Sequence, residues 1–136
     1  AEQGCIQFWL RNRWQGNDDK TYVFFDIGDE FYNRIRLYKD GANNFRFVIW
    51  GAKSEHGIFY DVSHWQAGEW HHIRANWYGD KMELYLDGEK SGWGHRGAVK
   101  MPIQLARYFF IGSDSTGSQQ AESVIDEFAI YSGPVT

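Results

Sequence analysis

The sequence predicts an all-β protein built as a two-layer antiparallel β-sandwich. Residues 68–88 contain two alternating runs on either side of Gly79 and Asp80, which is the pattern of a β-hairpin. Similar short runs recur along the chain between Gly, Asp and Asn turns, and no stretch has the 3.6-residue periodicity of an amphipathic helix. Many short strands with such turns are typical of a sandwich, because each sheet must bury its apolar face against another layer.

Four runs in the first part of the chain alternate apolar and polar residues, which indicates strands with one buried face. These strands are expected over residues 5–11, 21–27, 34–39 and 45–50. Gly28 begins one of the turns between them, and Asp40-Gly41 is a hairpin signal. The side chains expected to face the core are Ile6, Phe8, Leu10, Ile35, Leu37, Phe45, Phe47 and Ile49. Trp9 and Trp50 have the opposite phase and are expected on the outer faces.

The second part of the chain contains the hairpin and three further runs. The strands are expected over residues 58–62, 70–78, 82–86, 107–111 and 124–131. Trp70 and Trp77 lie in the first arm of the hairpin and are expected to pack in the core or within the sheet. Asp87-Gly88 closes the second arm with another turn signal. Residues 112–120 are rich in Ser, Gly and Gln, which is typical of a loop.

Three segments together resemble one known family. The hairpin contributes Trp70, His72, Ile73 and Leu84-Tyr85-Leu86-Asp87-Gly88, and the chain ends contribute Ile6-Gln7-Phe8-Trp9-Leu10 and Ile125-Asp126-Glu127-Phe128-Ala129-Ile130-Tyr131. In order and spacing they are similar to the hallmark strands of laminin G-like domains, which are members of the concanavalin A-like lectin and glucanase superfamily. The resemblance implies a jelly roll formed by residues 1–136 as a single domain, and it implies a structural role for His72.

Length and charge limit the classes of function. A chain of 136 residues has the size of one domain with one core. Its net charge of -4 is spread without long runs of one sign, so it lacks the basic surface that nucleic-acid binding requires. No apolar run reaches the roughly 18 residues of a membrane span, so no membrane insertion is expected.

The start of the chain and its single cysteine bear on the parent protein and on disulfide bonding. Because a strand follows directly after the first four residues, the chain is expected to be excised from a larger protein. Cys5 is the only cysteine, so no internal disulfide is expected, and burial in a strand is its ordinary role. The family resemblance implies a secreted or cell-surface protein.

The glucanases of the same superfamily raise the possibility of an enzyme. The resembling glucanases carry Glu-x-Asp-x-Glu or Glu-x-Asp-x-x-Glu along one strand, and retaining glycosidases need two carboxylates about 5 to 5.5 Å apart. The chain has neither spacing. Asp126 and Glu127 are adjacent and so on opposite faces of a strand, and Asp26 is separated from Glu30 by a turn. No catalytic residue is assigned, and the chain is expected not to be an enzyme.

Asp126 is the candidate metal ligand. Its phase in the last strand places it with the inward apolar residues Val124, Phe128 and Ile130, where an unpaired carboxylate is costly to desolvate. Its partner is expected to be a hydrogen-bond donor of the protein or a calcium ion, which many resembling jelly rolls bind near the chain ends. The histidines have no zinc-binding pattern.

Aromatic residues carry the strongest functional signal. They form 18% of the chain and include 7 tryptophans, more rings than a core of this size requires. Sugar rings stack on exposed indoles while polar side chains bind their hydroxyls. The candidate carbohydrate-binding residues are Trp14, Trp50, Trp65, Trp93, His95 and Arg96. A second collection at outward strand positions contains Trp9, Arg11, Arg34, Arg36, Tyr38, Arg46, Trp50, Arg74, Asn76, Glu83 and Tyr85. The sequence leaves open whether the loops or a sheet face form the site.

These observations predict a non-catalytic, lectin-like module that binds a polysaccharide or glycan by aromatic stacking and hydrogen bonding. One alternative is a protein-interaction or adhesion module of the laminin G-like type, in which aromatic and arginine side chains form a hot spot. The other alternative is a glycoside hydrolase of the glucanase type. Calcium is the candidate cofactor, and other domains of a parent protein are further candidate partners.

Overall fold

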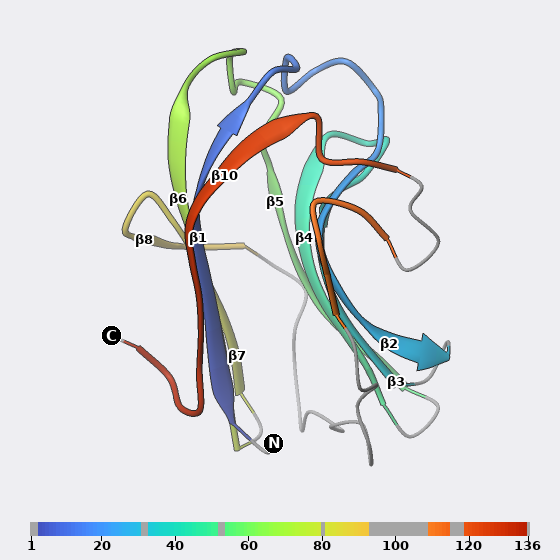
Figure 1. Ribbon diagram of the computed structural model, residues 1–136, viewed down its shortest axis with the longest axis vertical. Coiled ribbons are helices and arrows are strands. Elements are labelled where there is room, and N and C mark those ends of the chain that lie inside the picture. The colour runs from blue at the N-terminus through green and yellow to red at the C-terminus, as the bar shows by residue number, and fades with distance from the viewer. Residues whose placement is uncertain are drawn as a thin grey trace.

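The computed structural model describes residues 3–30, 33–51, 54–79, 81–92, 109–114 and 119–135. This part of the chain forms ten strands in two five-stranded antiparallel sheets that face each other (Figure 1). The predicted β-sandwich is therefore confirmed. Among the described residues, no helix is long and apolar enough to cross a membrane.

One sheet, here named the terminal sheet, contains the first and last strands. Its order is β10-β1-β6-β7-β8, with β1 Gly4–Asn12, β6 Trp70–Tyr78, β7 Lys81–Leu86, β8 Glu89–Ser91 and β10 Ser123–Tyr131. The predicted hairpin is β6 and β7, in which Ile73 pairs with Leu86. The turn into β8 uses Asp87 and Gly88, whose φ angles of 56° and 84° suit the Asp-Gly pair.

The other sheet, here named the meander sheet, places four consecutive strands side by side. Its order is β5-β4-β3-β2-β9, with β2 Tyr22–Glu30, β3 Asn33–Lys39, β4 Asn44–Gly51, β5 Ser54–Asp61 and β9 Phe109–Ile111. The chain passes between the two sheets after β1, β5, β8 and β9, which gives the crossed connections of a jelly roll. β5 starts before the predicted Ile58, because β4 pairs with the polar residues from Ser54 onward.

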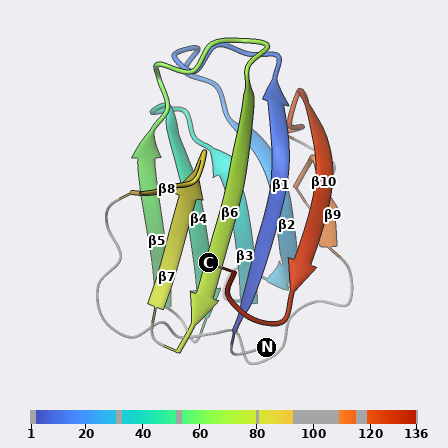
Figure 2. The same ribbon diagram turned by 90° about the vertical axis from the view of Figure 1, so that its left-hand side faces the viewer.

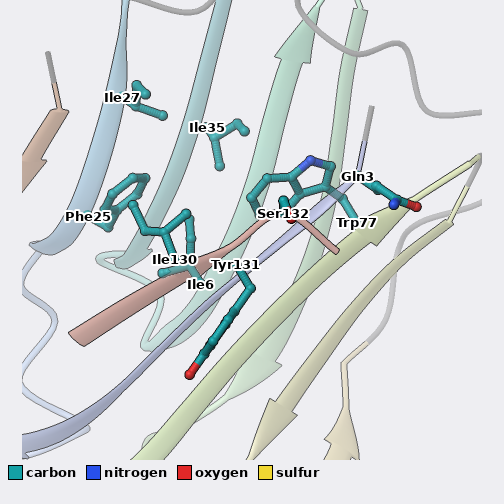
Figure 3. Close-up of a pocket in the computed structure, with 9 residues that line it drawn as sticks. All are labelled: Gln3, Ile6, Phe25, Ile27, Ile35, Trp77, Ile130, Tyr131 and Ser132. Carbon is teal, nitrogen blue, oxygen red and sulfur yellow. The ribbon is translucent and has the colours of Figure 1, made fainter. Parts of the chain in front are cut away.

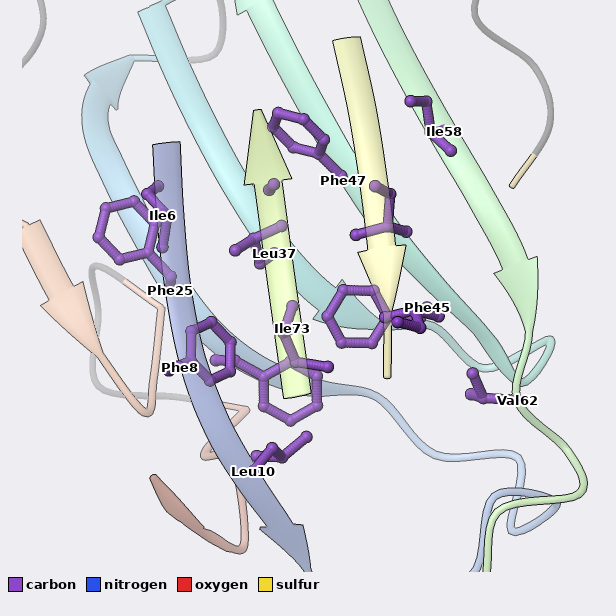
Figure 4. Close-up of a cluster of buried hydrophobic side chains, with 14 of the residues drawn as sticks. Ile6, Phe8, Leu10, Phe25, Leu37, Phe45, Phe47, Ile58, Val62 and Ile73 are labelled. Carbon is purple, nitrogen blue, oxygen red and sulfur yellow. The ribbon is translucent and has the colours of Figure 1, made fainter. Parts of the chain in front are cut away.

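Apolar side chains of the two sheets meet between them (Figure 4). Each of the residues predicted from alternation to face the core is at most 1% exposed: Ile6, Phe8, Leu10, Ile35, Leu37, Phe45, Phe47 and Ile49. A bulge in β2, where the register with β3 shifts between Val23 and Phe25, turns Phe24 and Phe25 both into the core. Each fully buried side chain of this size contributes about 1.5 to 3 kcal/mol.

The end of the chain crosses the outer face of the terminal sheet (Figure 2). The Val135 N–H donates to Asn76 Oδ1 (3.2 Å), and Asn76 Nδ2 donates to the Val135 carbonyl (2.9 Å). Cys5 pairs with Asn76 in the register and is fully buried, as predicted. Burial raises the pKa of the Cys5 thiol, so this residue stays protonated.

Candidate functional site

Two of the loop tryptophans predicted to contact a ligand are buried. Trp14 is 5% exposed and Trp65 is 3% exposed, so the expectation that the loops present these rings to solvent is wrong. The rings belong to one aromatic stack. Trp14 lies 4.9 Å from Tyr22 and 6.3 Å from Trp65 between ring centroids, and Trp65 lies 3.8 Å from His71. The stack fastens both loops to the sheets.

Hydrogen bonds hold Trp14 in the stack. Its Nε1–H donates to the Ala121 carbonyl (3.0 Å) and to Ser123 Oγ (3.1 Å). Asn12 Nδ2 donates to the Trp14 carbonyl (2.8 Å). With its ring covered and its N–H satisfied, Trp14 has no surface to offer a ligand, and its role is to anchor the loop.

A fully buried lysine lies beside this stack. Lys39 Nζ is 2.9 Å from Asp18 Oδ1, 2.9 Å from Asn43 Oδ1 and 2.7 Å from the Lys20 carbonyl. A buried ammonium is stable only when oxygen atoms replace its lost water. Lys39 therefore joins the loop after β1 to the turn between β3 and β4.

The contacts of Asp18 predict that the protein loses stability as the pH becomes acidic. Burial raises its pKa, but hydrogen bonds from Tyr22, Lys39 and Lys20 outweigh burial, so the pKa of Asp18 lies below its ordinary value of 3.8. Such a carboxyl contributes stability above its unfolded pKa and loses it as the pH falls through its folded pKa. Between about pH 5 and pH 2, urea denaturation should therefore show a smaller loss of stability for Asp18→Asn than for the wild type. Parallel curves for the two proteins would contradict this expectation.

Of the four remaining predicted sugar contacts, Trp50 is nearly buried and the other three lie outside the described residues. Trp50 lies on the outer face of the meander sheet, where it pairs with Arg34 and Glu55. It is only 9% exposed, which leaves too little of the ring for stacking. Trp93, His95 and Arg96 lie outside the described residues, and their roles stay predictions.

Asp126 faces the opposite way from the predicted direction. The register of β10 with β1 shifts between Gln7 and Trp9, and Glu127 has a φ of 51°, which together mark a β-bulge. One extra residue reverses the phase of the strand, so Phe128 packs against the core while Asp126 is exposed. The prediction that Asp126 is buried is wrong.

The exposure of Asp126 removes the argument from which a metal ligand was inferred. Its Oδ1 accepts a hydrogen bond from the N–H of Glu127 (2.8 Å). Within the described residues, no group of three or more His, Cys, Asp or Glu could hold a metal ion. Calcium stays a prediction, which binding measured with and without a chelator tests.

Among the described residues, the exposed tryptophans are Trp9 and Trp70, on the outer face of the terminal sheet. Trp9 is 38% exposed and Trp70 is 46% exposed. In the register of β1 with β6, Trp9 lies opposite His72. The next outward pair is Arg11 opposite Trp70, so the two indoles are diagonal neighbours on one face. On the other side of β1, Trp9 pairs with Asp126. These five residues are named the indole patch.

His72 supports the indole patch and adds a polar group to it. Its ring meets Trp9 edge to face, with 4.9 Å between centroids and 67° between planes. Burial and the charge of Arg74 lower the pKa of His72. The carboxylates of Asp87 and Glu127 act in the opposite direction without restoring the ordinary value. The imidazole is therefore neutral near pH 7, with one nitrogen that donates and one that accepts.

Arg11 joins the patch to a surface hollow. Its Nε donates to the Gly68 carbonyl (3.1 Å), which orients the guanidinium and leaves its terminal nitrogens for other acceptors. The hollow has a volume of about 470 Å³ and is lined by Arg11, Asn12, Arg13, Ala67, Gly68 and Val124. The stacking surface thus continues into a depression with both polar and apolar side chains in its lining.

Trp70 is the part of this patch that sequence reasoning placed wrongly. It was expected to pack in the core or within the sheet, as Trp77 does with an exposed fraction of 5%. The period of two contained the signal, because Trp70 shares its phase with His72 while His71 and Ile73 are buried.

The second predicted collection occupies two opposite faces of the molecule. On the outer face of the meander sheet, Asp26 is fully buried and pairs with Arg34 (3.2 Å) and Arg36 (3.0 Å). The guanidinium groups of Arg36 and Arg46 lie 5.9 and 6.0 Å from the centroid of the Tyr38 ring. These side chains bind one another, whereas the terminal sheet carries the exposed indoles.

Comparison with family models gives a match over almost the whole chain. A laminin G-type model described as "Concanavalin A-like lectin/glucanases superfamily" matches residues 2–136. No curated protein sequence matches the chain.

Solved structures share the fold at low sequence identity. Domains LG4-5 of the mouse laminin alpha1 chain have a TM-score of 0.74 at 13% identity, covering 97% of this chain and 36% of that chain. The receptor-binding domain of botulinum neurotoxin mosaic serotype C/D has a TM-score of 0.76 at 16% identity, covering 100% and 34%. An SAP-like pentraxin from Limulus polyphemus has a TM-score of 0.69 at 14% identity, covering 100% and 66%. The chain thus spans about a third of the length of the laminin and neurotoxin chains.

Proposed function

Because the chain belongs to the laminin G-type family of the concanavalin A-like lectin/glucanases superfamily, we propose that it is a non-catalytic module that binds a polysaccharide or glycan. The observation that carries the proposal is the indole patch, where two exposed indoles lie on neighbouring strands beside polar side chains. The similar neurotoxin domain is described as receptor-binding, which supports a binding role for this fold.

The proposed mechanism combines stacking with hydrogen bonding. The apolar C–H face of a sugar ring stacks on Trp9 or Trp70, as such faces do on amphipathic rings. Its hydroxyls bind the guanidinium of Arg11, the imidazole of His72 and the carboxylate of Asp126. Because these side chains stand on paired strands, little conformational entropy is lost on binding. The hollow at Arg11 extends the surface to a second sugar unit.

Replacing either exposed tryptophan should weaken glycan binding by about tenfold or more, because loss of a stacking partner costs about 1.4 kcal/mol or more. A glycan array followed by titration calorimetry of Trp9→Ala and Trp70→Ala measures this effect. Phe59→Ala is the matched control, because Phe59 is 38% exposed, as Trp9 is, but stands in β5 of the other sheet. If Phe59→Ala lost as much affinity for glycan, or if both tryptophan variants bound glycan as the wild type does, the indole patch would not be the binding site.

A protein partner is the second candidate function. Val124 is 39% exposed and pairs with Arg11 in β1, so it adds apolar area beside the patch. Exposed tryptophan and arginine side chains next to an apolar residue make a common hot-spot composition. Saturable binding to one class of sugar on the array favours the first proposal over this one, and release of reducing sugar would contradict both.

A location outside the cell, secreted or at the surface, completes the proposal. Glycans and polysaccharides are displayed there, and a module of this type concentrates its parent protein on them. Immunodetection of the parent protein on intact and on permeabilised cells tests the location.

A further inference from the structure

An apolar cavity of about 340 Å³ lies between the two sheets, at the end of the sandwich where β1 begins and β10 ends (Figures 1 and 3). The terminal sheet provides Ile6, Trp77 and Ile130 to its wall, and the meander sheet provides Phe25, Ile27 and Ile35. The cavity is thus built from both inner faces and is separate from the indole patch on the outer face.

The cavity lies where the two sheets diverge. β2 and β3 curve away from the terminal sheet at this end (Figure 1), and the side chains that line the cavity are drawn in Figure 3. The opening lies beside β10, where Ile130 is 47% exposed and Tyr131 is 44% exposed. The cavity therefore reaches the surface beside β10.

One buried polar group of a wall residue has no hydrogen-bond partner among the described residues. Trp77 is 5% exposed, and its buried Nε1–H finds no acceptor among the residues that the structure describes. Buried N–H groups in folded proteins are nearly always paired, because an unpaired one loses the free energy of its contact with water. An acceptor brought by a ligand would restore this pairing.

We propose that this cavity binds an uncharged, largely apolar small molecule that carries one hydrogen-bond acceptor, such as a ketone, ester or alcohol. Its volume falls within the range of about 300 to 1,000 Å³ that is typical of ligand pockets. The wall contains no charged side chain among its described residues, so an ionised ligand would lose its hydration without compensation. Apolar contact supplies the affinity, and the Trp77 N–H orients the acceptor.

The test uses the naphthyl ketone prodan, whose emission shifts to the blue in apolar surroundings, and 2-dimethylaminonaphthalene, which lacks the carbonyl. Wild-type protein should bind both saturably at one site. Trp77→Phe keeps an aromatic ring but removes the N–H. This variant should weaken prodan binding by about fivefold, the effect of one hydrogen bond, and leave the carbonyl-free probe unchanged.

Cavity-filling variants provide the second arm. Ile35→Phe fills the cavity from the meander sheet, and Ile130→Trp narrows the opening at an exposed position where folding is not at risk. Each should weaken both probes by about tenfold or more and abolish the rise in unfolding temperature that prodan causes in the wild type. Trp9→Ala should bind both probes as the wild type does, which separates this site from the indole patch.

Three outcomes would overturn the inference. The first is no saturable binding of either probe to the wild type. The second is unchanged binding in both Ile35→Phe and Ile130→Trp. The third is an equal loss of the two probes in Trp77→Phe, which would remove the indole N–H from recognition. None of these outcomes affects glycan binding by the indole patch.

Discussion

Lys39→Met should lower the free energy of unfolding by about 3 kcal/mol, in the range for removal of one partner from a buried ion pair. The ammonium of Lys39 is fully buried between the Asp18 carboxylate and three further oxygens. It also lies 5.5 Å from the ring centroids of Trp14 and Tyr22, which attract a cation. The variant leaves these groups around an uncharged side chain.

The expected loss lies at the lower end of that range because Asp18 keeps other partners. Its side chain is 20% exposed, and it still accepts hydrogen bonds from the Tyr22 hydroxyl and the Lys20 N–H. Urea denaturation followed by tryptophan fluorescence measures the change. The double variant Lys39→Met with Asp18→Asn should be less destabilised than the sum of the single variants, because the two groups interact.

Lys90→Met is the matched control for this prediction. Lys90 is 66% exposed in its side chain and lies 3.6 Å from Glu83, so it forms a surface ion pair. Such pairs contribute about 0 to 1 kcal/mol, and the control should change stability by no more than that. Equal losses of stability in the two lysine variants would show that burial does not increase the contribution of the Lys39 contacts.

The core was predictable because alternation along a strand reports burial directly. Ile6, Phe8 and Leu10 are separated by outward residues, and a strand can place them only on one face. The hairpin of β6 and β7 was predictable for the same reason, together with the turn residues Asp87 and Gly88. The pattern of a single segment is sufficient to predict burial where packing follows the period of two.

Alternation failed where a bulge changes its phase. Glu127 inserts one residue into β10, and from that point the inward and outward sets exchange places, so Asp126 is exposed while Phe128 is partly buried and packs against the core. The bulge in β2 likewise buries the neighbours Phe24 and Phe25 together. A bulge is defined by how a strand pairs with its neighbour, so the sequence of one segment alone does not predict it.

The loop tryptophans were misplaced because their burial depends on residues distant in the sequence. Trp14 sits in a polar segment, and only the folded chain brings Tyr22, Trp65 and His71 to its ring. The indole patch was partly predictable, since the outward phase of Trp9 places it on the surface. That Trp70 lies beside Trp9 could not be predicted without the register of β1 with β6.

Trp14→Ala should lower the free energy of unfolding by about 3 to 5 kcal/mol, the usual cost of truncating a buried tryptophan. The variant leaves a cavity between Tyr22 and Trp65 and removes the donor from the Ala121 carbonyl. Trp14→Phe keeps one ring in the stack and should cost only about 1 to 2 kcal/mol, mostly from the lost hydrogen bonds. Thermal and urea unfolding of both variants measure these differences.

Trp14→Phe also separates an anchoring role from a ligand contact. If Trp14 holds its loop, the folded variant should bind glycan as the wild type does, because the indole patch is untouched. If Trp14 contacts sugar, affinity should fall while stability changes little. Binding measured well below the unfolding temperature distinguishes these cases, and Trp9→Ala should give the reverse pattern, since Trp9 is 38% exposed and its loss opens no cavity in the core.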